Sequence, residues 1–99
     1  MKIHRIRVAI LGVGKIGKYH VREFSNLGAE VVAILGRSEQ SSYRTSKQLE
    51  KEFGVSINHY FKLEELLKNE KLEAVSICTP PDMHEKQIRL CLEHNLNVM

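Results

Sequence analysis

Residues 10–20 read ILGVGKIGKYH, in which Gly12, Gly14 and Gly17 are spaced as G-x-G-x-x-G. A nearly continuous apolar run, residues 6–11, comes directly before the glycines and is rich in β-branched residues, as in a strand covered on both faces. Apolar residues at roughly helical spacing come directly after them. A buried strand, a glycine-rich turn and a helix in this order predict the first unit of an α/β fold.

The rest of the chain continues the alternation of strands and helices. Helices are expected over residues 16–27, 39–53, 63–67 and 82–94, and strands over residues 6–11, 31–35, 55–60, 74–78 and from 97 onward. This alternation predicts one domain of the α/β class, a doubly wound parallel sheet with helices on both faces in three α/β/α layers. The last strand has only begun at Met99. We therefore expect the chain to be a fragment, truncated in its fifth strand.

Particular residues are expected to end the helices and to face the core. Gly28, Gly54 and Asn95 are the expected helix ends, with Gly28 in the left-handed conformation. Asp82 is the expected N-cap of the last helix, and Glu85 three residues later completes a capping box. The helical residues expected to face inward are Tyr19, Tyr43, Leu49, Phe53, Ile88, Cys91 and Leu92.

The composition is that of a soluble globular protein, with 42% hydrophobic and 27% charged residues. The net charge of +3 is scattered along the chain rather than gathered into a basic run, which does not favour nucleic-acid binding. Cys78 and Cys91 lack the spacing of a metal site and are interpreted as small buried residues of a cytoplasmic protein. No apolar stretch reaches the ~20 residues of a membrane span, and Met1–Arg5 does not resemble a signal peptide. We expect no metal, no nucleic-acid partner and no membrane partner.

The glycine motif has a physical interpretation where it joins a strand to a helix. Gly12 allows the tight turn, Gly14 lets a pyrophosphate approach the backbone, and Gly17 lets the helix pack closely on the strand. The free amides around Lys15 and Ile16 would meet phosphate oxygens in the positive field of the helix dipole. A lysine in the first helical turn opposes that dipole unless an anion docks there. The alternative is a glycine-rich turn that binds no ligand.

The second strand ends in Gly36-Arg37-Ser38 rather than in the carboxylate that holds the ribose 2′-hydroxyl of NAD. Without a carboxylate a 2′-phosphate is not repelled, and Arg37 offers a planar set of donors beside the Ser38 hydroxyl. The pattern favours NADP(H) as the cofactor, with NAD as the alternative. In the competing interpretation, Ser38 only caps the following helix and Arg37 is solvated.

Five strings along the chain resemble one known family. VAILGVGKIGKYH, VVAILGRS, EELL, EAVSICTPPDMH and NVM occur in this order between residues 8 and 99. Together they look like the N-terminal Rossmann domain of the glucose–fructose oxidoreductase / inositol 2-dehydrogenase (Gfo/Idh/MocA) family. The combination of G-x-G-x-x-G-x-x-H with a later T-P-x-x-x-H is far more specific than the glycines alone.

Carried over by motif, the resemblance implies cofactor contacts at three places: the glycine loop (residues 12–17), the end of the second strand, and the turn at residues 79–81, here called the T-P-P turn. The implied residues are Gly12, Val13, Gly14, Lys15, Ile16, Gly17, Gly36, Arg37, Ser38, Thr79, Pro80, Pro81 and His84. For His84 the alternative is a core histidine that shares a helical face with Ile88 and Cys91. His20 is expected to pack or cap beneath the glycine loop. No catalytic residue is expected, because the resemblance places the family's proton-transferring lysine after Met99, and no metal ligand is expected either.

The resemblance also implies an activity for the longer protein. It would be an NAD(P)-dependent oxidoreductase acting on a sugar, a polyol or a related hydroxy compound. Residues 1–99 would form the NAD(P)-binding Rossmann domain, and the small-molecule substrate would be held by a C-terminal domain absent from this chain. The protein could assemble as a homo-oligomer. The alternative function is a non-catalytic module that senses the dinucleotide and regulates.

Overall fold

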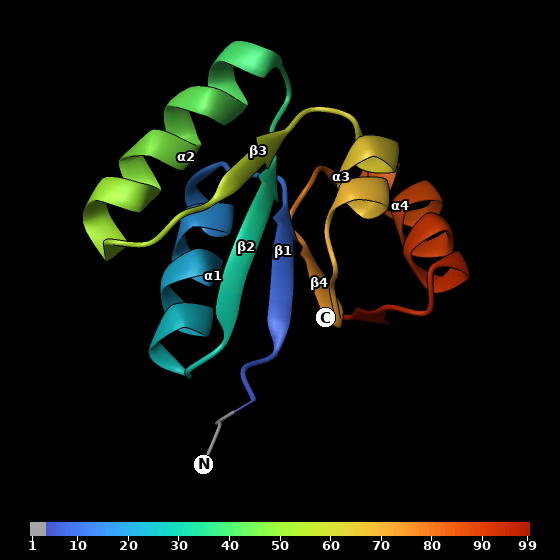
Figure 1. The fold of residues 1–99 in the computed structure, drawn as a ribbon. Helices are drawn as coiled ribbons and strands as arrows, with labels where there is room; N and C mark the ends of the chain where they lie inside the picture. Colours follow the sequence, from blue (N-terminus) through green and yellow to red (C-terminus); the bar gives the residue numbers. More distant parts are fainter. Residues whose placement is uncertain (1–3) are drawn as a thin grey trace.

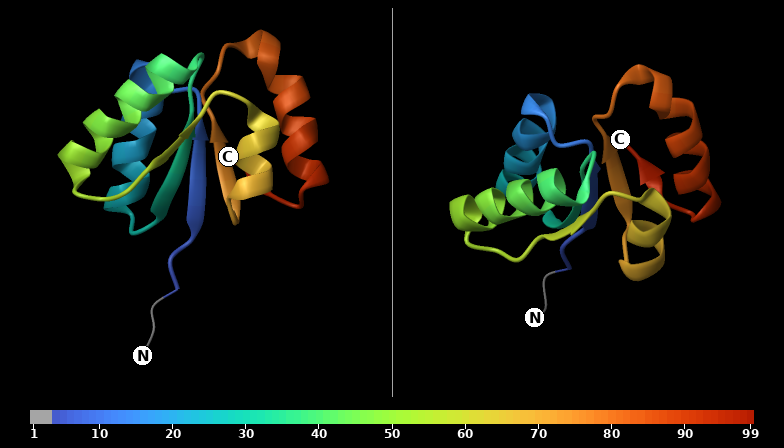
Figure 2. Two further views of the ribbon diagram at one scale, coloured as in Figure 1. Left: turned by 45° about the horizontal axis from the view of Figure 1, so that its top comes forward. Right: turned by 90° about the horizontal axis from the view of Figure 1, so that it is seen from above.

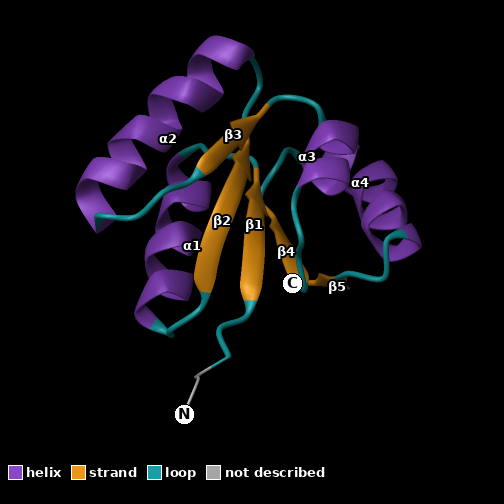
Figure 3. Ribbon diagram, viewed as in Figure 1, coloured by secondary structure: helices purple, strands orange, loops and turns teal. Residues whose placement is uncertain are grey.

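The computed structural model describes residues 4–99 and arranges five parallel strands in one sheet, in the order β3-β2-β1-β4-β5 (Figures 1 and 3). The strands are β1 (Arg7–Leu11), β2 (Glu30–Leu35), β3 (Asn58–Tyr60), β4 (Ala74–Ile77) and β5 (Asn97–Val98). The helices are α1 (Lys15–Asn26), α2 (Glu39–Phe53), α3 (Leu63–Asn69) and α4 (Pro81–Glu93). The opening residues 1–3, in which no signal peptide was recognised, lie outside the described residues. The predicted α/β alternation is confirmed, and each helix lies close to its expected range.

The helices cover the sheet in two layers. Figure 2 shows α1 and α2 on one face and α3 and α4 on the other. One buried cluster joins Val21 of α1 and Leu49 of α2 to the strands, and a second joins Leu66 of α3 and Cys91 of α4 to the opposite face. The doubly wound, three-layer architecture is therefore confirmed, and its layers explain why the strands are apolar on both sides.

β1 lies in the middle of the sheet and is its most buried strand. Residues 8–11 have no exposed surface, as their continuous apolar run predicts. The pairing of β1 with β2 shifts between Val8 and Ala9, so that Ala9 pairs with Ala33 and Val32 is the extra residue. The strand order runs outward in opposite directions from β1 and β4, and such a reversal leaves a crevice at the carboxyl ends of the strands.

The inward face of α2 differs from the expected one. The side chain of Tyr43 is 51% exposed, whereas Ser42, Thr45, Ser46 and Leu49 are buried. Small side chains suit this face because the first turns of α2 lie close to the end of β2. A Cβ atom on Gly36 would lie only 2.8 Å from the Cβ atom of Ser42. A tyrosine does not fit between surfaces that approach so closely, so the expectation for Tyr43 was wrong.

The start of α4 also differs from the expected one. The helix begins at Pro81, with Pro80 at the N-cap position and no side-chain cap, so the capping box of Asp82 and Glu85 does not form. Proline is well suited to the first helical position, because its missing N–H has no partner there in any case. Asp82 lies inside the first turn instead, where a negative charge suits the helix dipole.

Three further apolar side chains expected to face inward are exposed. They are Tyr19 on α1, and Ile88 and Leu92 on α4. The buried residues of α4 are Gln87 and Cys91, four positions apart on the face that meets the sheet. Polar Gln87 lies on the inward face, where an apolar residue was expected.

The remaining sequence expectations concern the ends of elements. Gly28 and Gly54 have φ values of 87° and 68°, and Asn95 has a φ of 59°, so all three adopt the left-handed conformation expected of helix ends. β3 begins only at Asn58, three residues later than expected, and Val55 is exposed. β4 ends at Ile77, which leaves Cys78 half-buried, whereas Cys91 is fully buried. Within residues 4–99, no helix combines the length and apolar composition needed to cross a membrane.

Candidate functional site

The three segments selected from the sequence meet at the carboxyl edge of the sheet. The Gly12 amide donates to the Leu35 carbonyl at 2.9 Å, which joins the end of β1 to the end of β2. The Cys78 amide donates to the Leu11 carbonyl at 2.7 Å, which joins the end of β4 to the end of β1. The glycine loop therefore lies between the Gly36-Arg37-Ser38 segment and the T-P-P turn, at the reversal of strand order.

Gly12 and Gly17 are glycines for steric reasons. Gly12 has a φ of 94°, and a Cβ atom there would lie 2.8 Å from the carbonyl atoms of Cys78 and from the Thr79 nitrogen. A Cβ atom on Gly17 would overlap the carbonyl oxygen of Gly12 and approach the Ile10 side chain to 3.8 Å. The first turn of α1 therefore packs against its own loop as well as against β1, whereas only the packing against the strand was expected.

Gly14 differs from these two glycines, because it lies in open space. It is exposed, its φ of −74° is ordinary, and a Cβ atom there would meet nothing within 4 Å. Gly14 is the N-cap of α1, and its carbonyl accepts the first helical bond from Lys18 at 3.0 Å. The space in front of its backbone is therefore open to a ligand, which is the role expected for the second glycine of the motif.

The first turn of α1 has backbone donors without acceptors and carries a positive charge. Among residues 4–99, the amides of Lys15, Ile16 and Gly17 have no acceptor, and α1 has neither a side-chain cap nor an acidic residue in its first turn. Lys15 is exposed beside these amides. Unpaired amides, the positive end of the helix dipole and an ammonium group together form an environment that favours an anion.

Ser38 has a structural role after β2. Its Oγ accepts from the Ser41 amide at 3.1 Å, and the Ser41 Oγ accepts from the Ser38 amide at 3.2 Å. This reciprocal pair is a capping box for α2. Arg37 is exposed, and its guanidinium has no hydrogen bond or ion pair to any residue of the described part of the chain. Of the two side chains, Arg37 is the one available to a ligand.

Replacing Ser38 by alanine is expected to lower the free energy of unfolding by about 1 kcal/mol, because the Ser41 amide loses its acceptor. Urea denaturation monitored by circular dichroism measures the change. Ser38→Asp is the matched control and is expected to keep the stability, since aspartate accepts from the same amide and suits the helix dipole. Equal stability of Ser38→Ala and the unmodified chain would show that the capping box contributes nothing.

Two side chains of α4 hold the T-P-P turn. The Nε2 atom of His84 bonds the Thr79 carbonyl, and the Thr79 Oγ1 donates to Oε1 of Gln87. Because a carbonyl only accepts, His84 carries its proton on Nε2. The ring of His84 therefore braces the turn from a half-buried position, a role that neither sequence interpretation described.

Gln87 was missed by sequence reasoning. It is 5% exposed, and its amide satisfies the hydroxyl of a turn that lies eight positions earlier. The available signal was its spacing of three positions from His84, which places the two residues on one face of a helix. A polar residue on a face expected to be apolar indicates a specific partner, because buried polar groups are hydrogen-bonded.

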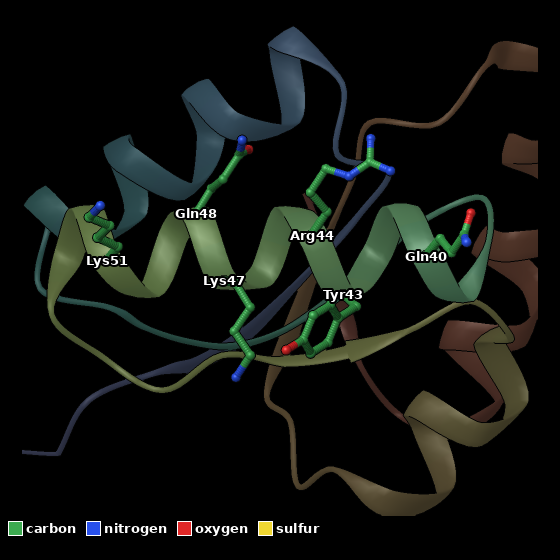
Figure 4. A pocket seen from close by; sticks show the side chains of 6 residues that line it. All are labelled: Gln40, Tyr43, Arg44, Lys47, Gln48 and Lys51. Carbon is green, nitrogen blue, oxygen red and sulfur yellow. The ribbon is translucent and has the colours of Figure 1, made fainter.

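One pocket lies away from the carboxyl edge of the sheet. It is open, has a volume of about 500 Å³ and runs along α2, lined by Gln40, Tyr43, Arg44, Lys47, Gln48 and Lys51 (Figure 4). Figure 4 shows Lys47 and Tyr43 pointing to the same side of α2, where the Lys47 ammonium lies 5.4 Å from the centre of the Tyr43 ring. Neither the glycine loop nor the T-P-P turn lines this pocket. Within residues 4–99, no group of three potential ligands is arranged to hold a metal ion.

Comparisons with known proteins match almost the whole chain. Residues 6–99 match the family model described as "Oxidoreductase family, NAD-binding Rossmann fold". Inositol 2-dehydrogenase 2 of Mycolicibacterium vanbaalenii is 34% identical over 96 residues, which cover 95% of this chain and 27% of that protein. The 4-carboxy-2-hydroxymuconate-6-semialdehyde dehydrogenase of a Sphingobium strain is 32% identical over 95 residues, which cover 94% of this chain and 28% of that protein.

A solved structure matches at the level of the fold. The crystal structure of myo-inositol 2-dehydrogenase from Lactobacillus plantarum has a TM-score of 0.82 and a sequence identity of 25%. The match covers 96% of this chain and 27% of that one. The chain therefore spans between a quarter and a third of the length of the curated relatives that it matches.

Proposed function

The chain belongs to the Gfo/Idh/MocA oxidoreductase family, with its NAD-binding Rossmann fold, and we propose that it binds a pyridine dinucleotide at the carboxyl edge of the sheet. The pyrophosphate would lie in front of Gly14 and the first turn of α1, with the nicotinamide half toward the T-P-P turn. The observation that carries the proposal is the set of unpaired amides on α1 beside the open space at Gly14. An anion is the ligand that such a helix start binds.

We propose NADP(H) as the preferred cofactor. A carboxylate side chain at position 36 has no room, because a Cβ atom there would already meet Ser42 at 2.8 Å. The acceptor that would hold the 2′-hydroxyl of NAD is therefore absent from this position, and α2 would have to shift to admit it. Arg37 supplies the guanidinium for a 2′-phosphate, while Ser38 keeps α2 in place by its capping box.

The described residues would position the cofactor rather than react with it. When bound, the nicotinamide supplies the hydride chemistry. Thr79 and Pro80 would form the wall of the crevice, and His84 would keep the Thr79 carbonyl turned toward α4. We assign no general acid or base within residues 4–99.

We propose further that the longer protein is an oxidoreductase for a sugar, a polyol or a related hydroxy compound. Relatives that match nearly all of this chain carry dehydrogenase names, and they extend well beyond the length matched. A further domain would hold the substrate, and residues 1–99 would be the cofactor-binding domain. A cytoplasmic location and self-association belong to the same proposal, and the two free cysteines suit a reducing compartment.

The unmodified chain is expected to bind NADPH more tightly than NADH, by about ten- to a hundredfold, because a guanidinium–phosphate contact is a charge-assisted hydrogen bond. Arg37→Ala is expected to remove most of that difference by weakening the binding of NADPH alone. Titrations followed by nicotinamide fluorescence give both dissociation constants.

Arg89→Ala is the matched control for Arg37→Ala, because Arg89 is an exposed arginine on α4 whose guanidinium pairs with Glu85 and with no other residue of the range 4–99. It is expected to leave both dissociation constants within about twofold, as a surface ion pair contributes little. Equal binding of NADH and NADPH by the unmodified chain would overturn the assignment of NADP(H). Failure to bind either dinucleotide would overturn the proposed site.

A further inference from the structure

A short polar chain crosses the otherwise apolar layer between α1 and the sheet. Ser76, in the middle of β4, is 2% exposed. Its Oγ lies 3.3 Å from Nδ1 of His20 on α1 and 3.7 Å from Sγ of Cys78 at the end of β4. The contact between His20 and Ser76 joins residues 56 positions apart in the sequence. It is therefore a tertiary contact and no part of the regular hydrogen bonding of either element.

The Ser76 hydroxyl links the other two polar groups. Burial raises the pKa of the Cys78 thiol, with the Ser76 hydrogen bond acting weakly in the opposite direction, so the thiol keeps its proton at neutral pH. With its single hydrogen, the Ser76 hydroxyl can donate to one of these two neighbours and accept from the other. Hydrogen bonds restrict the relative orientation of the groups that they join, unlike the apolar contacts of Val21 on the same helix.

The two ends of this polar chain lie on the two segments that border the crevice, namely α1 and the end of β4. These two segments are its walls. His20 lies little more than one turn after the start of α1, so that it is on the same rigid helix as the unpaired amides. Ser76 lies in β4, and the strand is followed by Cys78 and Thr79, whose backbone atoms pack against Gly12. The contact between His20 and Ser76 therefore spans the reversal of strand order between β1 and β4.

We propose that His20 and Ser76 form a positioning pair, which sets the spacing between the phosphate-binding end of α1 and the T-P-P turn. The inference rests on the proposed dinucleotide site, and it assigns the pair no contact with the cofactor. A dinucleotide that contacts both α1 and the T-P-P turn binds most tightly at one particular distance between them. The loss of a directional bond between the walls is thus expected to weaken binding beyond its effect on folding.

The test measures NADPH binding and thermal unfolding for a set of variants of the full 99-residue chain. Ser76→Ala removes the hydroxyl, and His20→Phe removes the ring nitrogens while it keeps a ring against Phe24, whose ring centre lies 6.2 Å away. Each is expected to raise the dissociation constant about three- to tenfold, the range of one hydrogen bond. The double variant is expected to bind no more weakly than the weaker single variant, because both remove the same contact.

Two further variants separate positioning from stability. Ser46→Ala is the matched control, since Ser46 is a fully buried serine whose Oγ donates to the Tyr43 carbonyl at 2.9 Å, within α2. It is expected to lower the melting temperature as Ser76→Ala does, but to leave NADPH binding within about twofold. Ser76→Thr keeps the hydroxyl and is expected to restore binding.

The outcomes are distinguishable. If the unmodified chain binds NADPH and both single variants bind it equally well, the positioning pair is wrong and the dinucleotide site stands. Additive losses in the double variant, or an equal loss in Ser46→Ala, would also overturn the pair. If the unmodified chain binds no dinucleotide, the proposed function fails, and the positioning pair fails with it.

Discussion

Gly12→Ala is expected to lower the free energy of unfolding by about 2–5 kcal/mol, the sum of backbone strain and overpacking. The strain arises because the φ of 94° is unfavourable for a residue with a Cβ atom. The overpacking arises because that Cβ atom would lie 2.8 Å from backbone atoms of Cys78 and Thr79, which cannot move as a flexible side chain can. Denaturation by urea, monitored by circular dichroism, gives the change.

Gly28→Ala separates the two contributions. Gly28 also has a left-handed backbone, with a φ of 87°, but a Cβ atom there would meet nothing within 4 Å. Its replacement is expected to cost only the conformational part, about 1–2 kcal/mol. Equal losses for Gly12→Ala and Gly28→Ala would show that the close approach of β4 to the glycine loop contributes nothing to stability.

Gly14→Asp is expected to act on stability and on binding in opposite directions. Aspartate is a preferred N-cap and suits the helix dipole, so the free energy of unfolding is expected to rise by about 0.5–1 kcal/mol. The new carboxylate would occupy the amides of α1 and repel a pyrophosphate. We expect the affinity for NADPH to fall by more than about a hundredfold, as for a lost set of charge-assisted hydrogen bonds.

Gly14→Asn is the matched control for charge, because asparagine caps a helix about as well as aspartate and is neutral. It is expected to weaken NADPH binding less than Gly14→Asp does. Titration with NADPH, together with urea denaturation of each variant, checks both effects. If Gly14→Asp bound NADPH as the unmodified chain does, the dinucleotide could not lie in front of the first turn of α1.

The effects expected at Gly12 and Gly14 differ because the glycines of one motif have different roles. Gly12 and Gly14 are equivalent letters in G-x-G-x-x-G, and local sequence predicted a turn at one and a phosphate approach at the other. The steric limit on Gly12 comes from Cys78 and Thr79, more than sixty positions away in the sequence. Only the pairing of β4 beside β1 brings those atoms to the loop.

The wrong placements of apolar side chains in the core have a common cause. Tyr43, Ile88 and Leu92 were placed in the core because apolar residues at helical spacing usually face inward. Which side of a helix meets the sheet depends on the angle and distance at which the helix packs, and the sequence of one helix contains neither. Close contact between Ser42 and Gly36 requires small side chains on α2, and the T-P-P turn requires a polar partner from α4.

The sequence by itself determined the local features of this chain: the alternation of strands and helices, the left-handed ends at Gly28 and Gly54, and the helix start that follows the glycine loop. These depend on backbone preferences and on periodicity within a few residues. The tertiary structure alone decided the strand order, the exclusion of a side chain at Gly36, the hold of Gln87 on Thr79 and the contact between His20 and Ser76. Each of these is a contact across the fold, and its geometry exists only after the sheet has brought separate segments together.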